Sequence, residues 1–195
     1  MNIHRMMMRL ARFMAILGGL VLTALIVLTC VSVLGRGINT FLHWDVIETA
    51  MPGLSKSLLD WGVGPILGDT ELVEVGMAFA ILSFFPFCQI TAGHATVDIF
   101  TANFPAKVNR VLQAITDIVF AGVLILIAAR LWAGMEGKMA YNETSFLLQY
   151  PIWWGFAAAF AAAAAASVVG IYVAIMRVIE MMTARMIIEG GGAEH

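Results

Sequence analysis

Residues 13–34 read FMAILGGLVLTALIVLTCVSVL, a stretch of 22 residues without a charged side chain. A helix rises about 1.5 Å per residue, so about 20 apolar residues cross the roughly 30 Å hydrocarbon core of a bilayer. The stretch is too long for the apolar part of a cleavable signal peptide, and no small-x-small cleavage site closes it. It therefore predicts a transmembrane helix.

The composition of the whole chain extends this interpretation. Of the 195 residues, 61% are hydrophobic and only 12% are charged, whereas a soluble domain carries about 25% charged residues. Too few charged side chains are present to cover a soluble surface, so membrane lipids must solvate much of the chain. The formal net charge of -2 provides no basic field for nucleic acid, which we exclude as a partner.

Three further apolar stretches are long enough to cross a membrane: residues 71–91, 111–130 and 151–176. With residues 13–34 they predict an all-α membrane protein, a single four-helix domain over residues 1–195. No internal repeat is visible, and four spans are too few for two inverted halves that hold broken helices around a substrate.

The orientation of the spans follows from the lysines and arginines near their ends, since these residues are enriched on the cytoplasmic side. Seven fall on one side of the predicted membrane: Arg5, Arg9, Arg12, Lys107, Arg110, Arg177 and Arg185. Four fall on the other side: Arg36, Lys56, Arg130 and Lys138. We therefore expect the N- and C-termini to be cytoplasmic.

Two segments outside the spans have distinctive compositions. In the extracytoplasmic segment 36–70, apolar residues recur at three- and four-residue steps: Trp44, Ile47, Met51, Leu54, Leu58 and Trp61. This spacing predicts short amphipathic interfacial helices that contact either membrane lipids or a partner protein. The tail 186–195 contains three consecutive glycines from Gly190 and is expected to be mobile.

A charged residue near the end of the third span lies opposite the start of the second. Arg130 lies about 19 residues along the third span, which brings it close to the outer boundary of the membrane. Glu71 and Glu74 begin the antiparallel second span at the same boundary. An unpaired charge in lipid is costly. We therefore predict an ion pair between Arg130 and either Glu71 or Glu74, which would fix the register of the two helices.

Asp117 lies about two turns into the third span, near its cytoplasmic boundary. Ionisable residues inside a span are candidates for function. Lys107, Arg110 and His94 are within plausible reach of its carboxylate. Two interpretations stay open: a structural ion pair or hydrogen bond, and a role in carrying a proton or cation.

Small residues recur at four-residue steps in the fourth span: Ala158, Ala162, Ala166 and Gly170. Such residues let helices approach closely in lipid. The stripe is either a docking seam for another subunit or a surface for packing within this chain, and composition alone also accounts for it.

The sequence offers no recognisable catalytic chemistry. All four histidines, at positions 4, 43, 94 and 195, lie at termini or in connections, so none can serve as an axial haem ligand between spans. Cys30 and Cys88 have no C-x-x-C spacing. No nucleophile and base pair and no cofactor motif appears, and we predict a non-enzyme without a metal or cofactor.

Residues 71–151 carry spaced features that resemble a known family, the DctQ-type small integral-membrane subunit of TRAP (tripartite ATP-independent periplasmic) transporters. Glu71 opens the second span, and His94-Ala95-Thr96-Val97-Asp98 closes it with a His-x-x-x-Asp pattern similar to the family's cytoplasmic connection. Phe104-Pro105 precedes the third helix. The stretch from Thr144 to Pro151 is similar to the family's Ser-x-x-Leu-x-x-Pro approach to the fourth helix. The segment from Arg36 to Gly68 departs from the family in being longer.

The resemblance implies a complex in the bacterial inner membrane. Its other members would be a large membrane transport subunit, as a separate chain, and a periplasmic solute-binding protein that delivers an organic anion. It implies sodium-driven uptake of carboxylates, with this chain as a scaffold that does not bind the substrate. His94, Asp98 and Asp117 would lie at its cytoplasmic side. Two alternatives remain: a self-contained homo-oligomeric channel or exporter with Asp117 or Glu74 facing a pore, and a membrane enzyme.

Overall fold

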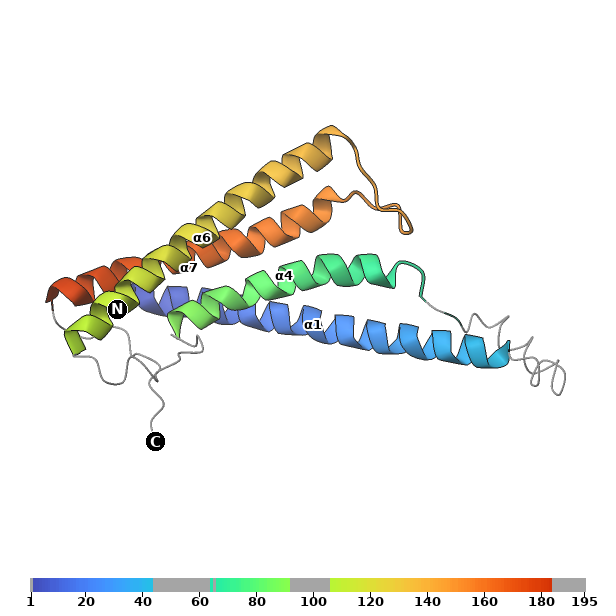
Figure 1. Ribbon diagram of the computed structural model, residues 1–195, viewed down its shortest axis with the longest axis horizontal. Coiled ribbons are helices and arrows are strands. Elements are labelled where there is room, and N and C mark those ends of the chain that lie inside the picture. Colours follow the sequence, from blue (N-terminus) through green and yellow to red (C-terminus); the bar gives the residue numbers. More distant parts are fainter. Residues whose placement is uncertain (1, 44–63, 65, 92–105, 184–195) are drawn as a thin grey trace.

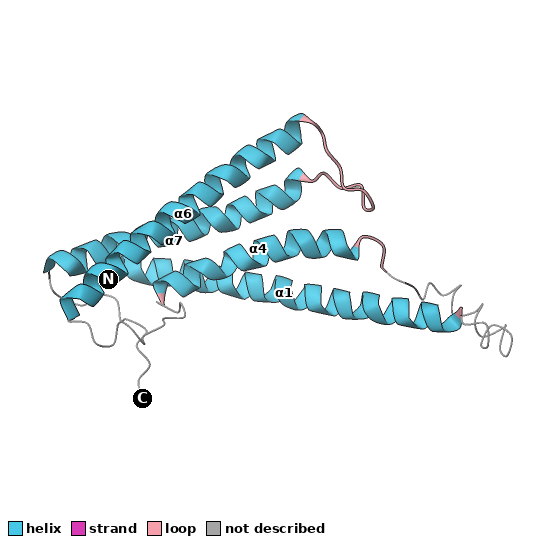
Figure 2. Ribbon diagram, viewed as in Figure 1, coloured by secondary structure: helices cyan, strands magenta, loops and turns pink. Residues whose placement is uncertain are grey.

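The structure, a computed structural model, describes residues 2–43, 64, 66–91 and 106–183. Four helices account for most of these residues: α1 (Asn2–Leu42), α4 (Asp69–Ile90), α6 (Ala106–Ala140) and α7 (Trp153–Thr183). No strand occurs among the described residues (Figure 2). The chain is therefore all-α, as predicted.

The four helices form two antiparallel hairpins (Figure 1). In one hairpin α1 packs against α4, and in the other α6 packs against α7. Contacts of α7 with α4, and a few with α1, join the hairpins. The hairpins meet where α4 and α7 end, which we call the closed end, and they diverge towards the place where α4 and α7 begin, which we call the open end (Figure 1).

All four helices are long and apolar enough to cross a membrane. The shortest, α4, has 22 residues and a length of about 33 Å, slightly more than a hydrocarbon core. The prediction of four spans is confirmed. The predicted orientation of the termini stays a prediction, although the start of α1 and the end of α7 both lie at the closed end (Figure 1).

The helices extend beyond the predicted spans. The first span was expected to end at Leu34, but α1 continues to Leu42 with 41 residues, through the start of the predicted extracytoplasmic segment. The charge of Arg36 limits the part of the helix that lipid can cover but does not end a helix, and the first proline beyond it is Pro52. The predicted amphipathic helices in the rest of that segment, His94, Asp98 and the tail 186–195 lie outside the described residues.

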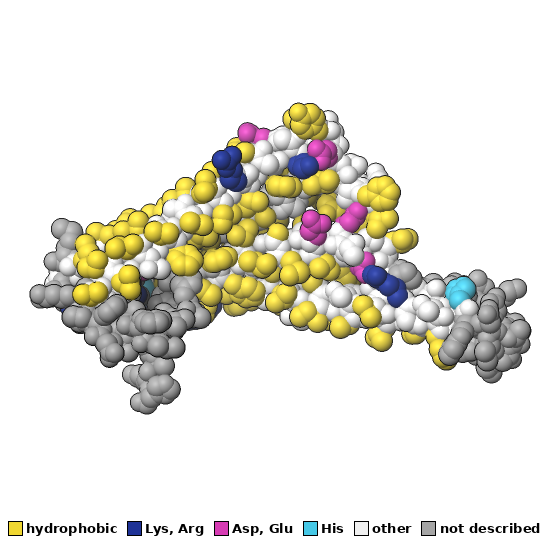
Figure 3. All heavy atoms as spheres, in the orientation of Figure 1, with side chains coloured by type: hydrophobic (Ala, Val, Ile, Leu, Met, Phe, Trp, Pro, Cys, Tyr) yellow, Lys and Arg dark blue, Asp and Glu magenta, His cyan; other side chains and the backbone are white. Residues whose placement is uncertain are grey.

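Small side chains make up much of the interior, and α7 contributes more of them than any other helix. In the most apolar part of each helix, half of the α7 residues are buried, against 11% for α1. Glycines allow close crossings: a Cβ on Gly18 of α1 would lie 2.9 Å from Ser83 Cβ of α4. Large hydrophobic side chains cover the outer surfaces of α1 and α6, as expected for surfaces in lipid (Figure 3).

Candidate functional site: polar joints between the helices

A first polar joint connects α1 to the start of α4. The buried hydroxyl of Ser32 donates a hydrogen bond to Asp69 Oδ2, and Arg36 Nη2 forms an ion pair with the same oxygen. Asp69 is only 8% exposed, and its Oδ1 accepts from the Thr70 N–H at 2.8 Å. Sequence reasoning missed this joint. The four-residue step from Ser32 to Arg36 places both side chains on one helical face. This spacing was the feature of the sequence from which the joint could have been predicted.

A second polar joint connects α4 to the loop between α6 and α7. Glu71 Oε1 accepts a hydrogen bond from the Leu147 N–H at 2.9 Å, and Oε2 accepts one from the Leu148 N–H at 3.1 Å. Successive backbone N–H groups of this kind form a concave anion site. The joint brings together two of the features on which the family resemblance was based, the acidic residue at position 71 and the stretch 144–151.

The loop is shaped to present these N–H groups. Thr144 and Pro151 form an isolated β-bridge, and the Ser145 N–H donates to Tyr150 O at 2.9 Å. Gly68, at the N-cap of α4, has φ 77°, and a Cβ there would lie 2.4 Å from Leu148 Cγ. Glycine is therefore required at position 68, both for its conformation and for the close approach of the loop.

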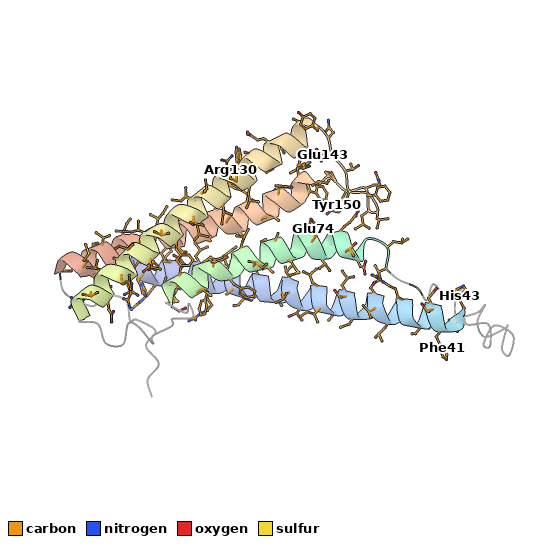
Figure 4. The ribbon with its side chains drawn as sticks, in the orientation of Figure 1. Phe41, His43, Glu74, Arg130, Glu143 and Tyr150 are labelled. Atoms are coloured by element: carbon orange, nitrogen blue, oxygen red, sulfur yellow. The ribbon has the colours of Figure 1, made fainter. Side chains whose placement is uncertain are left out.

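The predicted partner of Arg130 is not beside it in the structure. Among the described residues, Arg130 forms no ion pair with Glu71 or Glu74. The physical reason is the packing of the helices: α6 packs on α7, which lies between α6 and α4 in the view of Figure 4. Glu71 holds the loop instead, and near the end of α6 Lys138 Nζ pairs with Glu143 Oε2 at 2.5 Å.

A third polar joint connects α6 and α7 towards the closed end. Arg177 Nε lies 3.3 Å from Asp117 Oδ2, and Arg177 Nη1 lies 2.9 Å from Glu180 Oε2. All three side chains are largely buried. Arg177 was not among the partners that the sequence suggested for Asp117, because the separation of 60 residues along the chain hides their proximity.

The small-residue stripe of α7 faces the interior of this chain. Ala162 and Ala166 are completely buried, and a Cβ on Gly170 would lie 3.0 Å from Gln89 Oε1 of α4 and 3.6 Å from Ala121 Cα of α6. Ala158 is half-buried. In this structure the stripe packs α7 against its own neighbours, so its buried members are not accessible to another subunit.

Between the hairpins, towards the open end, lies a cavity of about 620 Å³ lined by residues of α4, α6, α7 and the 144–151 loop. Its polar lining includes Glu71, Glu74 and Tyr150, and acidic side chains gather there (Figure 3). Partial burial, together with the charges of Glu71 and Glu74, raises the pKa of the Tyr150 phenol above its usual value. Tyr150 therefore stays a neutral hydrogen-bonding group.

The described residues contain no group of three or more His, Cys, Asp and Glu side chains that could hold a metal ion. Cys30 and Cys88 are free thiols. The polar groups that the structure brings together connect helices to one another. The fold and its joints define a multi-pass helical membrane protein whose buried charges pair with one another inside the bundle.

A comparison with known protein families assigns the chain to one family within this class. Residues 62–181, more than half of the chain, match the family described as tripartite ATP-independent periplasmic transporters, DctQ component. The chain belongs to this family and is the small membrane component of a TRAP transporter. That is a family of transporter components and not of enzymes. No curated protein and no solved structure matches the chain.

Proposed function

We propose that this chain is the scaffold subunit of a sodium-coupled transporter that takes up organic carboxylates across a bacterial inner membrane. In this proposal a periplasmic binding protein delivers the solute, and a large membrane subunit, a separate chain, moves it. The present chain braces the large subunit in the membrane with both termini in the cytoplasm and does not bind the solute.

The observation that carries this proposal is the continuity of the helices. Transporters commonly place substrate and ions at broken helices near the middle of the membrane, where freed backbone groups serve as ligands. Here α1, α4, α6 and α7 each run without interruption. The ion pairs of the described residues connect elements of this chain, and the outer faces of α1 and α6 offer apolar surface to lipid or to a larger subunit.

Reconstitution tests the proposal. The chain is purified through its own tag. Proteoliposomes are prepared with the chain alone, with the chain and the large subunit, and with both plus the binding protein. We expect the large subunit to co-purify, and carboxylate uptake to require all three proteins and an inward sodium gradient. Replacing sodium with potassium should abolish uptake. Solute flux through the chain alone would contradict the scaffold role and support the self-contained channel.

A further inference from the structure

One side of α6 is apolar except for a single charge. The helix packs inward through five buried residues: Ala114, Ala121, Leu124, Ala128 and Met135. At about 3.6 residues per turn, Arg130 lies on the opposite side of the helix from these residues, and it is exposed. We call this side the α6 outer face and define it by six residues: Val119, Val123, Leu126, Arg130, Ala133 and Gly137.

Arg130 lies within the membrane-spanning length of α6 and not at its end. Four residues after it, Gly134 lies against α7, because a Cβ there would be 2.7 Å from Phe156 Cε1. This step is about 6 Å along the helix, and Phe156 is about 4.5 Å beyond Trp153, the first residue of α7. Tryptophan is typical of the membrane interface. Arg130 is therefore about 10 Å deeper than the interface that Trp153 marks.

A charge at this depth needs a partner, and the described part of the chain does not supply one. Among the described residues, Arg130 forms no ion pair or hydrogen bond. Charged residues within a span almost always face a bundle interior or a water-filled cavity and pair with another group. Arg130 instead lies on α6 away from the space that Glu74 and Tyr150 border (Figure 4). Its position therefore fits a larger bundle, in which α6 has a further neighbour.

The residues beside Arg130 let another helix approach closely. Ala133 and Gly137 follow it on the same face, and a Cβ on Gly137 would meet nothing within 4 Å. Glycine lowers the stability of a helix, and packing within the described part of this chain does not require it at position 137. Small residues are typical of close helix contacts in membranes. The surface next to the charge thus suits a protein helix.

A carboxylate fits the depth of Arg130 better than a lipid phosphate does. Phosphates lie in the headgroup region, outside the hydrocarbon core, whereas a membrane helix can carry an acidic side chain at any depth. Arginine and carboxylate form two parallel hydrogen bonds, the geometry that a guanidinium group favours. Charge complementarity therefore points to an acidic residue of a neighbouring helix.

We propose that the α6 outer face is a docking surface for a transmembrane helix of the large transport subunit, and that an aspartate or glutamate of that helix pairs with Arg130. The apolar residues Val119, Val123 and Leu126 pack against the same helix on the side of the closed end. This inference rests on the proposed function, in which the large subunit is a separate chain that the present chain braces.

Co-purification tests the docking surface. The full-length chain carries the tag, the large subunit is co-expressed with it, and the recovery of the large subunit in mild detergent is measured. Arg130→Glu should lower this recovery about tenfold or more, because like charges then face each other. The control Arg12→Glu makes the same change at an exposed arginine of α1 and should keep the recovery. Arg130→Gln should also lower recovery, yet the variant chain purified alone should melt at the wild-type temperature, which separates docking from folding.

Crosslinking identifies the partner. A photoreactive amino acid in place of Leu126 should crosslink to the large subunit, and Arg130→Glu should abolish this crosslink. Changing the acidic residue of the crosslinked helix to arginine should restore the recovery that Arg130→Glu loses. Equal recovery with Arg130→Glu and Arg12→Glu would overturn the docking surface and leave the scaffold role in place, as would a crosslink only to lipid or to a second copy of the chain. A wild-type chain that recovers no large subunit would overturn both.

Discussion

At the scale of single residues, Arg177 is the charge whose loss should have the largest effect. Its guanidinium group pairs with two largely buried carboxylates, those of Asp117 and Glu180. Removing one partner of a buried ionic cluster leaves uncompensated charge and costs about 3–5 kcal/mol. Arg177→Met should therefore lower the melting temperature in detergent strongly. Arg12→Met, which changes an exposed arginine of α1, should have little effect.

The same cluster allows a rescue experiment. A buried ion cluster can often be replaced as a whole by apolar residues without loss of stability. The triple variant Asp117→Leu, Arg177→Met and Glu180→Leu should thus recover most of the stability that Arg177→Met loses. If Arg177→Met melts at the temperature of Arg12→Met, the cluster does not contribute to stability.

At the scale of elements, Glu71 fixes the loop between α6 and α7 onto the start of α4. Its carboxylate accepts two backbone N–H groups, from Leu147 and Leu148, and hydrogen bonds to a charged group contribute about 1.5–3 kcal/mol. Glu71→Gln replaces one accepting oxygen with an amide donor. We expect hydrogen exchange at these two amides to accelerate about tenfold or more. Glu74→Gln, which removes a carboxylate without such bonds, should leave the exchange unchanged, and equal exchange in both variants would contradict the role of Glu71.

The helices themselves were predictable from the sequence, because long uncharged runs such as 13–34 have few alternatives to a membrane-spanning helix. Which helices pack against one another was not predictable from the sequence. Helices that are apolar on every side give little indication of which face meets which partner. Arg130 was therefore assigned to α4 by its depth alone, although α6 packs on α7. The Asp69–Arg36 and Asp117–Arg177 pairs depend on rotations of whole helices about their axes, which charge positions along the chain do not specify.

At the scale of the whole molecule, the two hairpins meet around Gly170. A Cβ there would lie 3.0 Å from Gln89 Oε1 of α4 and 3.4 Å from Leu124 Cδ1 of α6, so this position of α7 touches both neighbouring helices. Gly170→Leu should force them apart and destabilise the bundle by about 1–3 kcal/mol, the usual effect of overpacking. We expect the variant to have a lower melting temperature, and we expect the Cys88 thiol on α4 to react more readily with a maleimide.

Gly122 provides the matched control for this experiment. It also lies inside a helix, α6, but a Cβ there meets nothing within 4 Å. Gly122→Leu therefore gains helix propensity, about 1 kcal/mol, without a clash and should melt at or above the wild-type temperature. The two substitutions make the same chemical change, so a difference between them isolates packing from helix propensity. Equal melting temperatures would mean that the hairpins are not held together at Gly170, and that the closed end is as loosely packed as the open end.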